Sequence, residues 1–171
     1  MFLYKKFYPK KIFKNLLQID INFLRQNNIK AIFLDIDNTI MDYDGNIIEG
    51  LENWVENLKD YGIKFCIVSN TSKKEKAERV SNLLKIPFIN LSTKPLRRGL
   101  KKAKKIIKIY DDSVIAVVGD QVMTDVWGAN RCKMFSILVE PIKDKDILVT
   151  RFNRIFERII LKEYYKNNKE E

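Results

Sequence analysis

The sequence of 171 residues contains no histidine and only two cysteines, and these absences narrow its chemistry. A chain without histidine excludes Ser-His-Asp triads, histidine phosphatases and most zinc sites. Cys66 and Cys132 stand far apart in no CxxC pattern, which argues against a disulfide framework and favours a reducing compartment. Neither has an arginine six residues later, so a cysteine-loop phosphatase is not supported. Any catalysis must therefore use carboxylates, lysine, serine or threonine, and a hard metal ion bound by oxygen atoms is the expected cofactor.

Long apolar runs are also missing, since no uninterrupted stretch approaches the roughly 20 residues that a transmembrane helix needs. After four residues the chain meets Lys5 and Lys6, and no signal-peptide core follows. We therefore expect a cytoplasmic protein. Glycine and proline are few, at 6 and 4 residues, and neither a linker nor an internal repeat is visible. One domain over residues 1–171 is the expectation.

Acidic side chains are absent from residues 1–17, which combine aromatic and aliphatic residues with five lysines. Such a basic amphipathic arm resembles an interfacial membrane anchor. The alternative, which we prefer, is a packing arm that covers the domain's own sheet. The net charge of +10 also suggests an anionic partner, with a role in solubility as the competing explanation.

Apolar runs alternate with helical patterns along the rest of the chain. The alternation predicts an α/β fold in which helices cover both faces of a parallel sheet. Asp20 is the expected N-cap of a first helix, Ser72 and Glu75 form a capping-box pattern, and Asp44-Gly45 marks the turn of a small flap hairpin over 41–50. The expected strands are 31–34, 63–68, 87–89, 113–118 and 135–139, and the later helices are 51–62, 73–84, 95–109, 123–131 and 146–164.

Polar residues gather where three of these strands end. Asp35 and Asp37 follow the first strand and project to the same side, where two anions repel unless they share a cation or one is protonated. An Asx-rich turn is the simpler explanation of this pair alone. Ligands of open parallel sheets bind beyond the carboxyl ends of the strands, so all these clusters should face one crevice. The expected site residues are Asp35, Asp37, Ser69, Asn70, Lys94, Asp120 and Asp125.

Phosphoryl transfer through a carboxylate suits this crevice. An ionised aspartate is a nucleophile that needs no base, which fits a chain without histidine. Mg²⁺ held between carboxylates removes most of the repulsion between that anion and a phosphate. We therefore assign Asp35 as nucleophile and metal ligand, and Asp120 as a second metal ligand.

The remaining roles follow from the same chemistry. Asp37 would protonate the leaving alkoxide and later deprotonate the attacking water. Ser69 and Lys94 would hold phosphate oxygens, while Asp125 would orient Lys94 or a metal-bound water. Each residue alone is common in loops or on surfaces. Their joint occurrence, in this order and after these strands, carries the assignment.

The order of these segments resembles the four motifs of the haloacid dehalogenase (HAD) superfamily of phosphatases. The segments are Asp-Ile-Asp-Asn-Thr at 35–39, Val-Ser-Asn at 68–70, Lys-Pro at 94–95 and Gly-Asp-Gln-Val-Met-Thr-Asp at 119–125. The family's first motif, DxDx[TV], matches at Asp35, Asp37 and Thr39. Ile86-Pro87-Phe88 and the segment 150–158 further resemble the YqeG-like branch of subfamily IIIA, which is related to mitochondrial phosphatidylglycerophosphate phosphatase. The resemblance covers roughly residues 12–162.

This resemblance implies a HAD-like, Rossmann-type fold and an Mg²⁺-dependent phosphomonoesterase that acts through an aspartyl-phosphate. It implies that Thr39 and Asn70 join the phosphate-binding residues and that Asp37 joins the metal ligands. It also implies phosphatidylglycerophosphate as substrate, met at the inner membrane face.

Spacing adds that the crevice should be open. The gaps from Asp35 to Ser69 and from Asn70 to Lys94 are too short for a lid domain of about 50 residues. An open site suits a phosphate displayed on a large or membrane-bound substrate. The helix at 95–109 carries an unbroken basic surface that could contact anionic lipid or nucleic acid, or could simply be solvated. Its basic residues are Arg97, Arg98, Lys101, Lys102, Lys104, Lys105 and Lys108.

Other functions stay open at this point. A phosphatase of nucleic-acid ends would use the same basic surface. A receiver-like phosphoacceptor also uses a strand-end aspartate, a hydroxyl and a lysine, but it does not need the acid that Asp37 supplies. A catalytically idle membrane or RNA adaptor is the third alternative.

Overall fold

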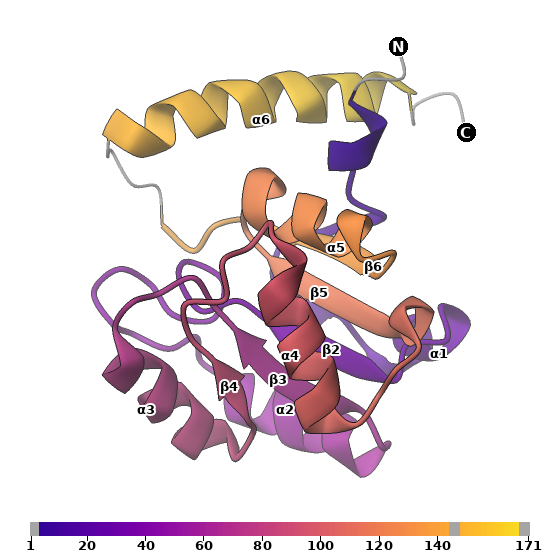
Figure 1. The fold of residues 1–171 in the computed structure, drawn as a ribbon, viewed down its shortest axis with the longest axis vertical. Helices are drawn as coiled ribbons and strands as arrows, with labels where there is room; N and C mark the ends of the chain where they lie inside the picture. The colour runs from indigo at the N-terminus through magenta and orange to yellow at the C-terminus, as the bar shows by residue number, and fades with distance from the viewer. Residues whose placement is uncertain (1–3, 144–147, 168–171) are drawn as a thin grey trace.

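A six-stranded, wholly parallel sheet forms the centre of the molecule, in the strand order β1-β6-β5-β2-β3-β4 (Figure 1). The computed structural model describes residues 4–143 and 148–167, with the side chains of 148–155 and 167 left aside. The strands are β1 Lys11–Phe13, β2 Ala31–Leu34, β3 Lys64–Val68, β4 Phe88–Ile89, β5 Ile115–Gly119 and β6 Phe135–Val139. The α-helices are α1 Ile21–Gln26, α2 Leu51–Asp60, α3 Lys74–Leu84, α4 Arg97–Ile107, α5 Trp127–Arg131 and α6 Leu148–Asn167.

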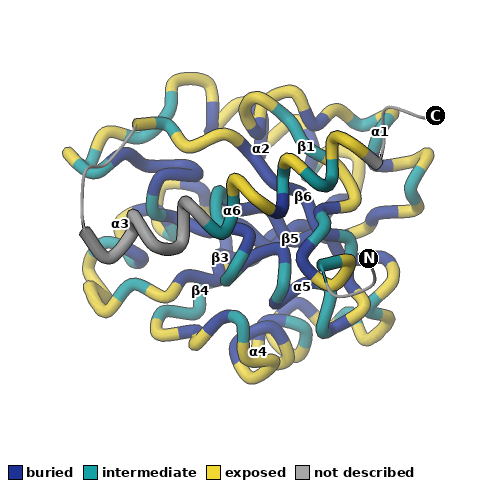
Figure 2. The backbone as a smooth tube through the Cα atoms, turned by 90° about the horizontal axis from the view of Figure 1, so that it is seen from above, coloured by how far each residue is buried: buried dark blue, intermediate teal, exposed yellow. Residues whose placement is uncertain are grey.

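Alternate residues of the central strands enter different cores, because successive side chains of a strand point to opposite faces. Ile32 and Leu34 of β2 pack in the cluster that contains the apolar side chains of α1, α2 and α3. Ala31 and Phe33 pack in the cluster of α4 and α5 on the other face. The predicted α/β architecture with helices on both faces is therefore confirmed. All four β2 residues are buried, and its neighbours β3 and β5 are mostly dark blue, hence buried, in Figure 2.

The N-terminal arm packs on the protein. β1 joins the sheet at its edge, parallel to β6. The sequence pattern did not predict β1, because a strand of three residues is too short to show a recognisable alternation of apolar and polar residues. Phe7 lies in a third cluster with Leu138 of β6 and Ile160 of α6, and Leu16 joins the core beneath the sheet. Residues 1–3 lie outside the described residues. These contacts favour the packing-arm interpretation over the membrane anchor.

Several predicted boundaries move for identifiable reasons. Asp20 caps α1 as expected, its carboxylate accepting the Phe23 N–H at 2.7 Å. The capping box at Ser72 is wrong: α3 begins at Lys74, because the Lys73 N–H already donates to the Thr71 hydroxyl at 3.3 Å and keeps the chain in a turn.

Other elements also differ from their predicted ranges: for example, α2 ends at Asp60 rather than 62, and α4 covers Arg97–Ile107 rather than 95–109. The strand expected from 113 begins at Ile115, after a short 3₁₀ turn, Asp112–Val114, that the Asp111 side chain caps. The helix expected over 123–131 is a π-helical turn, Val122–Val126, followed by α5. Residues 146 and 147 of the last predicted helix lie outside the described residues.

The predicted flap over 41–50 is present as a tight loop with one antiparallel bridge, between Met41 and Ile47. Gly45 adopts a left-handed backbone, φ +87°, which glycine tolerates without strain. Among the described residues, no helix combines the length and apolar character needed to cross a bilayer.

Candidate active site

A cavity of about 190 Å³ opens beyond the carboxyl ends of β2, β3 and β5. In a parallel sheet these ends meet at one edge, so loops far apart in sequence converge there. The cavity is lined by Asp35, Asp37, Ser69, Asn70, Thr71, Lys94, Gln121 and Thr124. Five of the seven expected site residues thus line one small hollow. Of the other two, Asp125 is paired with Lys94, and Asp120 lies close to Asp35 in the acidic group described below.

Lys94 is the centre of the site's charge network. Its ammonium donates to Asp35 at 2.8 Å and to Asp125 at 2.6 Å, and the three side chains are almost fully buried. Burial alone lowers the Lys94 pKa, but the charges of Asp125 and Asp35 outweigh it and raise the pKa overall. Lys94 therefore remains a cation inside the protein. The expected contact between Asp125 and Lys94 is present.

A third carboxylate completes an acidic group. Asp35, Asp120 and Asp125 each place an oxygen within 4.8 Å of the others. Within the described part of the chain Lys94 is the ammonium that pairs with this group, so the three ionised carboxylates and Lys94 together carry a net charge of two negative units. A hard divalent cation with oxygen ligands fits this donor set and balances this charge. Asp125, which we assigned a supporting role, belongs to this group, whereas Asp37 does not.

The pKa values of two of these acids are raised by their burial and by the neighbouring negative charge. Burial, followed by the charge of Asp125, raises the Asp120 pKa well above its ordinary value. Burial also raises the Asp35 pKa to about 6, against the opposing attraction of Lys94. Both shifts would be relieved by a cation held between the carboxylates.

The Asp37 carboxylate has a partner that sequence reasoning missed. Lys76, on the first turn of α3, forms a close ion pair with Asp37. Both side chains are partly exposed, at 18% and 34%, so Asp37 lies at the mouth of the site rather than in its buried floor. Lys76 could not be identified from the sequence, because it is one of many lysines. It lies on α3, earlier in the chain than the Lys94-Pro95 segment that resembles the family's lysine motif.

The phosphate-binding candidates separate into three kinds. Ser69 is buried, lines the cavity, and its hydroxyl accepts the Thr71 N–H at 3.2 Å. The Asn70 amide holds the following loop, since it donates to the Lys94 carbonyl at 2.9 Å and accepts the Lys94 N–H at 2.8 Å. Thr39 is absent from the cavity wall, and its hydroxyl donates to Asp120 at 3.3 Å.

Asn38 connects two distant loops through hydrogen bonds that the sequence did not reveal. Its side-chain amide donates to the Lys143 carbonyl at 2.8 Å and accepts the Lys143 N–H at 2.9 Å. The Lys143 ammonium in turn pairs with Asp42 of the flap at 2.7 Å. The loop after β2 is thereby tied to the segment after β6. Asn38 has a left-handed backbone, φ +62°, a conformation that asparagine adopts more readily than most residues.

Gly119 gives a sharp test of this packing. A Cβ added there would lie 2.2 Å from Cγ of Asp125, so Gly119→Ala must push Asp125 away from Lys94. We expect kcat/KM to fall about hundredfold, the effect typical of a displacement of about 1 Å in an active site. Steady-state phosphate release measures it. Gly128→Ala is the matched control, because the nearest atom there is 3.4 Å away. Equal activity of both variants would show that the place of Asp125 does not matter.

Comparison with known proteins agrees with this geometry. A family model described as mitochondrial PGP phosphatase matches residues 2–143. The chain is 38% identical over 160 residues to a protein of Bacillus subtilis named probable phosphatase YqeG, with 93% of this chain and 92% of that protein covered.

Solved structures share the fold at low sequence identity. An uncharacterized protein from Listeria monocytogenes serotype 4b matches with a TM-score of 0.54 and 19% identity, covering 70% of this chain and 85% of that one. The cobalt-bound deoxy-D-mannose-octulosonate 8-phosphate phosphatase of Haemophilus influenzae matches with a TM-score of 0.52 and 16% identity, covering 66% and 69%. Since the family model spans most of the chain and the Bacillus relative nearly all of it, this protein belongs to the mitochondrial PGP phosphatase family, as a HAD-type phosphatase of the YqeG branch that hydrolyses phosphoric monoesters.

Proposed function

We propose that the protein is an Mg²⁺-dependent phosphatase that forms an aspartyl-phosphate on Asp35. The observation that carries this proposal is the buried network in which Lys94 joins Asp35 to Asp125, at the floor of a cavity. This arrangement holds a nucleophilic oxygen, a fixed cation and an acidic group within reach of one phosphate. The oxygen donors of Asp35, Asp120 and Asp125 would hold Mg²⁺, which when bound neutralises charge on the phosphate.

The chain's own residues divide the reaction between them. The Asp35 carboxylate attacks phosphorus, and the bond from phosphorus to the leaving oxygen breaks. Asp37, at the mouth of the cavity, gives its proton to that oxygen. It then takes a proton from the water that cleaves the aspartyl-phosphate and releases inorganic phosphate. Lys94 and the Ser69 hydroxyl steady the phosphate oxygens, while the Asn70 amide keeps the Lys94 backbone in place.

Phosphatidylglycerophosphate is the substrate that we propose. The family description supports it, and so does the open site: between β2 and β3 the chain forms only the flap and α2, and between β3 and Lys94 only α3 and β4. A phosphate displayed at a membrane could enter such a site without a lid. The exposed basic residues of α4 would face anionic lipid, each adding about 1 kcal/mol of attraction. We assign this contact to α4 rather than to the N-terminal arm, because Phe7 and Ile12 of the arm pack inward in the third cluster.

A substrate panel tests the proposal. Purified protein would be given phosphatidylglycerophosphate in anionic vesicles, soluble sugar phosphates, nucleotides and end-phosphorylated oligonucleotides. We expect the highest kcat/KM on the lipid, and a fall of about a thousandfold after chelation that added Mg²⁺ reverses. Turnover of oligonucleotide ends without lipid hydrolysis would favour the nucleic-acid phosphatase. A stable phosphoryl-protein without turnover would favour a receiver-like domain, and inactivity on every substrate would favour an adaptor.

A further inference from the structure

The segment after β5 carries two of the three carboxylates of the acidic group. Asp120 follows the last residue of β5, and Asp125 lies in the π-helical turn Val122–Val126. The turn folds back on its own start, since the Asp125 N–H donates to the Gln121 carbonyl at 3.0 Å and the Gln121 N–H donates to the Asp125 carboxylate at 3.2 Å. Whatever fixes the start of this turn therefore also fixes the positions of two candidate metal ligands.

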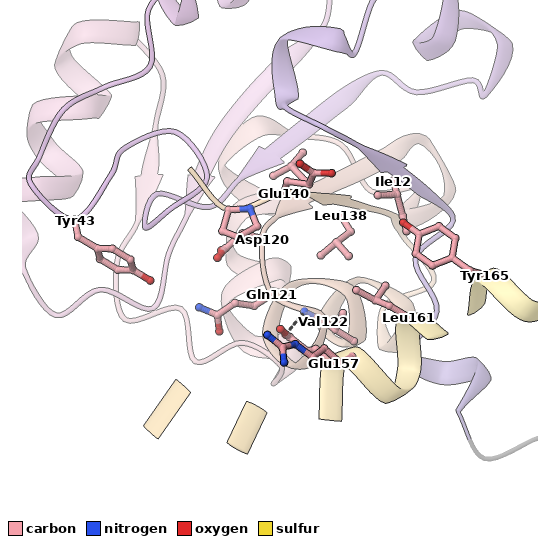
Figure 3. A pocket seen from close by; sticks show the side chains of 13 residues that line it. Ile12, Tyr43, Asp120, Gln121, Val122, Leu138, Glu140, Glu157, Leu161 and Tyr165 are labelled. Carbon is pink, nitrogen blue, oxygen red and sulfur yellow. Dashed lines mark hydrogen bonds between the residues drawn. The ribbon is translucent and has the colours of Figure 1, made fainter. Parts of the chain in front are cut away.

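A side chain of α6 holds the first N–H of this turn. Backbone N–H groups at the start of a helical turn have no partner inside it. Within the described structure, the preceding residue, Gln121, makes no capping hydrogen bond with its side chain. The acceptor is instead the Glu157 carboxylate, which takes the Val122 N–H at 2.7 Å across 35 residues of sequence (Figure 3). Hydrogen bonds to a charged acceptor are about twice as strong as those between neutral groups, so this contact is a firm one.

Glu157 and Asp120 line the same cavity, which measures about 300 Å³ and lies between α6 and the segment after β5 (Figure 3). The charged residues on its wall are the acids Asp120, Glu140 and Glu157 and the base Arg158, so the wall is net negative. After burial and two other carboxylates, the charge of Glu157 also raises the pKa of Asp120. A further carboxylate beside an acidic group is unfavourable unless a cation balances it. The position of Glu157 therefore points to metal binding rather than to folding alone.

We infer that Glu157 is a positioning residue for the candidate metal site. By holding the start of the turn, it keeps Asp120 and Asp125 in the arrangement that binds a divalent cation. The inference rests on the proposed function, because it concerns the cation which that function requires. It gives a role to one residue of the segment 150–158, which the catalytic roles above do not use. Residues that orient metal ligands without binding the metal typically contribute about ten- to a hundredfold to metal affinity.

Calorimetric titration of the metal-free, full-length protein with MgCl₂, without substrate, tests the inference. Glu157→Ala removes the acceptor, and the Kd for Mg²⁺ should rise about ten- to a hundredfold. Glu157→Gln keeps an oxygen that accepts the Val122 N–H, so its Kd should lie closer to that of the parent than to that of Glu157→Ala. Glu163→Ala is the matched control, because it is the same change on the same helix outside the described wall of the cavity. This control should bind Mg²⁺ as the parent does.

Two further measurements separate positioning from folding. The kcat of Glu157→Ala should recover when Mg²⁺ is raised well above the new Kd, because Glu157 acts through the turn and takes no part in the chemistry. A lower melting temperature with an unchanged Kd would assign Glu157 to folding alone and overturn the inference. A Glu157→Gln variant that binds Mg²⁺ as weakly as Glu157→Ala would also overturn it. A parent protein that bound no Mg²⁺ would contradict the proposed function, and the inference with it.

Discussion

Replacing Asp35 with asparagine is expected to lower kcat by about four orders of magnitude or more, as loss of a nucleophile does in other enzymes. The amide keeps the shape of the side chain and still accepts a hydrogen bond from Lys94, but it cannot attack phosphorus. Steady-state release of inorganic phosphate measures the loss. Mass spectrometry of the quenched reaction should show a phosphoryl adduct in the parent protein and none in the variant. Asp60→Asn, at an exposed position at the end of α2, is the control and should keep full activity.

The same variant should not melt earlier than the parent in the absence of metal. The folded-state pKa of Asp35 is raised from 3.8 to about 6. A raised carboxyl pKa gives stability that is present below 3.8 and lost as pH rises to about 6, so at neutral pH the ionised group already destabilises the fold. Asparagine removes that charge. A variant that loses both turnover and several degrees of melting temperature would contradict a purely catalytic role for Asp35.

Replacing Lys94 with methionine is expected to affect both activity and folding. Methionine has a similar length but no charge, so two buried carboxylates lose their ion pair. Breaking a buried pair by removing one partner costs about 3–5 kcal/mol of the free energy of unfolding. Urea unfolding at neutral pH measures this cost, and phosphate release should become undetectable. Lys30→Met, at an exposed position just before the amino end of β2, is the control and should change neither quantity.

A double variant separates the two effects of Lys94. Adding Asp125→Asn to Lys94→Met removes one of the uncompensated charges, so part of the lost stability should return. Activity should stay lost, because the cation that steadies the phosphate is still missing. If the double variant were no more stable than Lys94→Met, the pairing of Lys94 with Asp125 would not be the source of the cost.

Much of the fold and of the site could be predicted because both depend on local signals. β6 has the predicted bounds, 135–139, since five apolar or small residues lie between clear turns. Asp35 and Ser69 lie where their strands end, and parallel strands bring those ends to one edge whatever the loops do. The order of the motifs therefore determined the site without knowledge of any side-chain contact.

What could not be predicted depends on contacts between distant segments. Lys76 pairs with Asp37 across 39 residues, and Asn38 holds Lys143 across 105. Neither pairing leaves a periodic or motif-like trace in the sequence. The hydrogen bond of Thr39 could not be predicted for a related reason: its partner Asp120 follows another strand, and only the folded loops decide which oxygen its hydroxyl reaches.

The short strand β1 protects one edge of the sheet against pairing with other copies of the protein. It covers one border of the sheet, where β6 would otherwise present five residues of unpaired backbone. Bare borders of that sort recruit foreign strands and seed aggregates. At the opposite border β4 is only two residues long, too little to template growth. Forms of the protein shortened past Phe13 should therefore self-associate, which makes the basic N-terminal segment a guard against polymerisation.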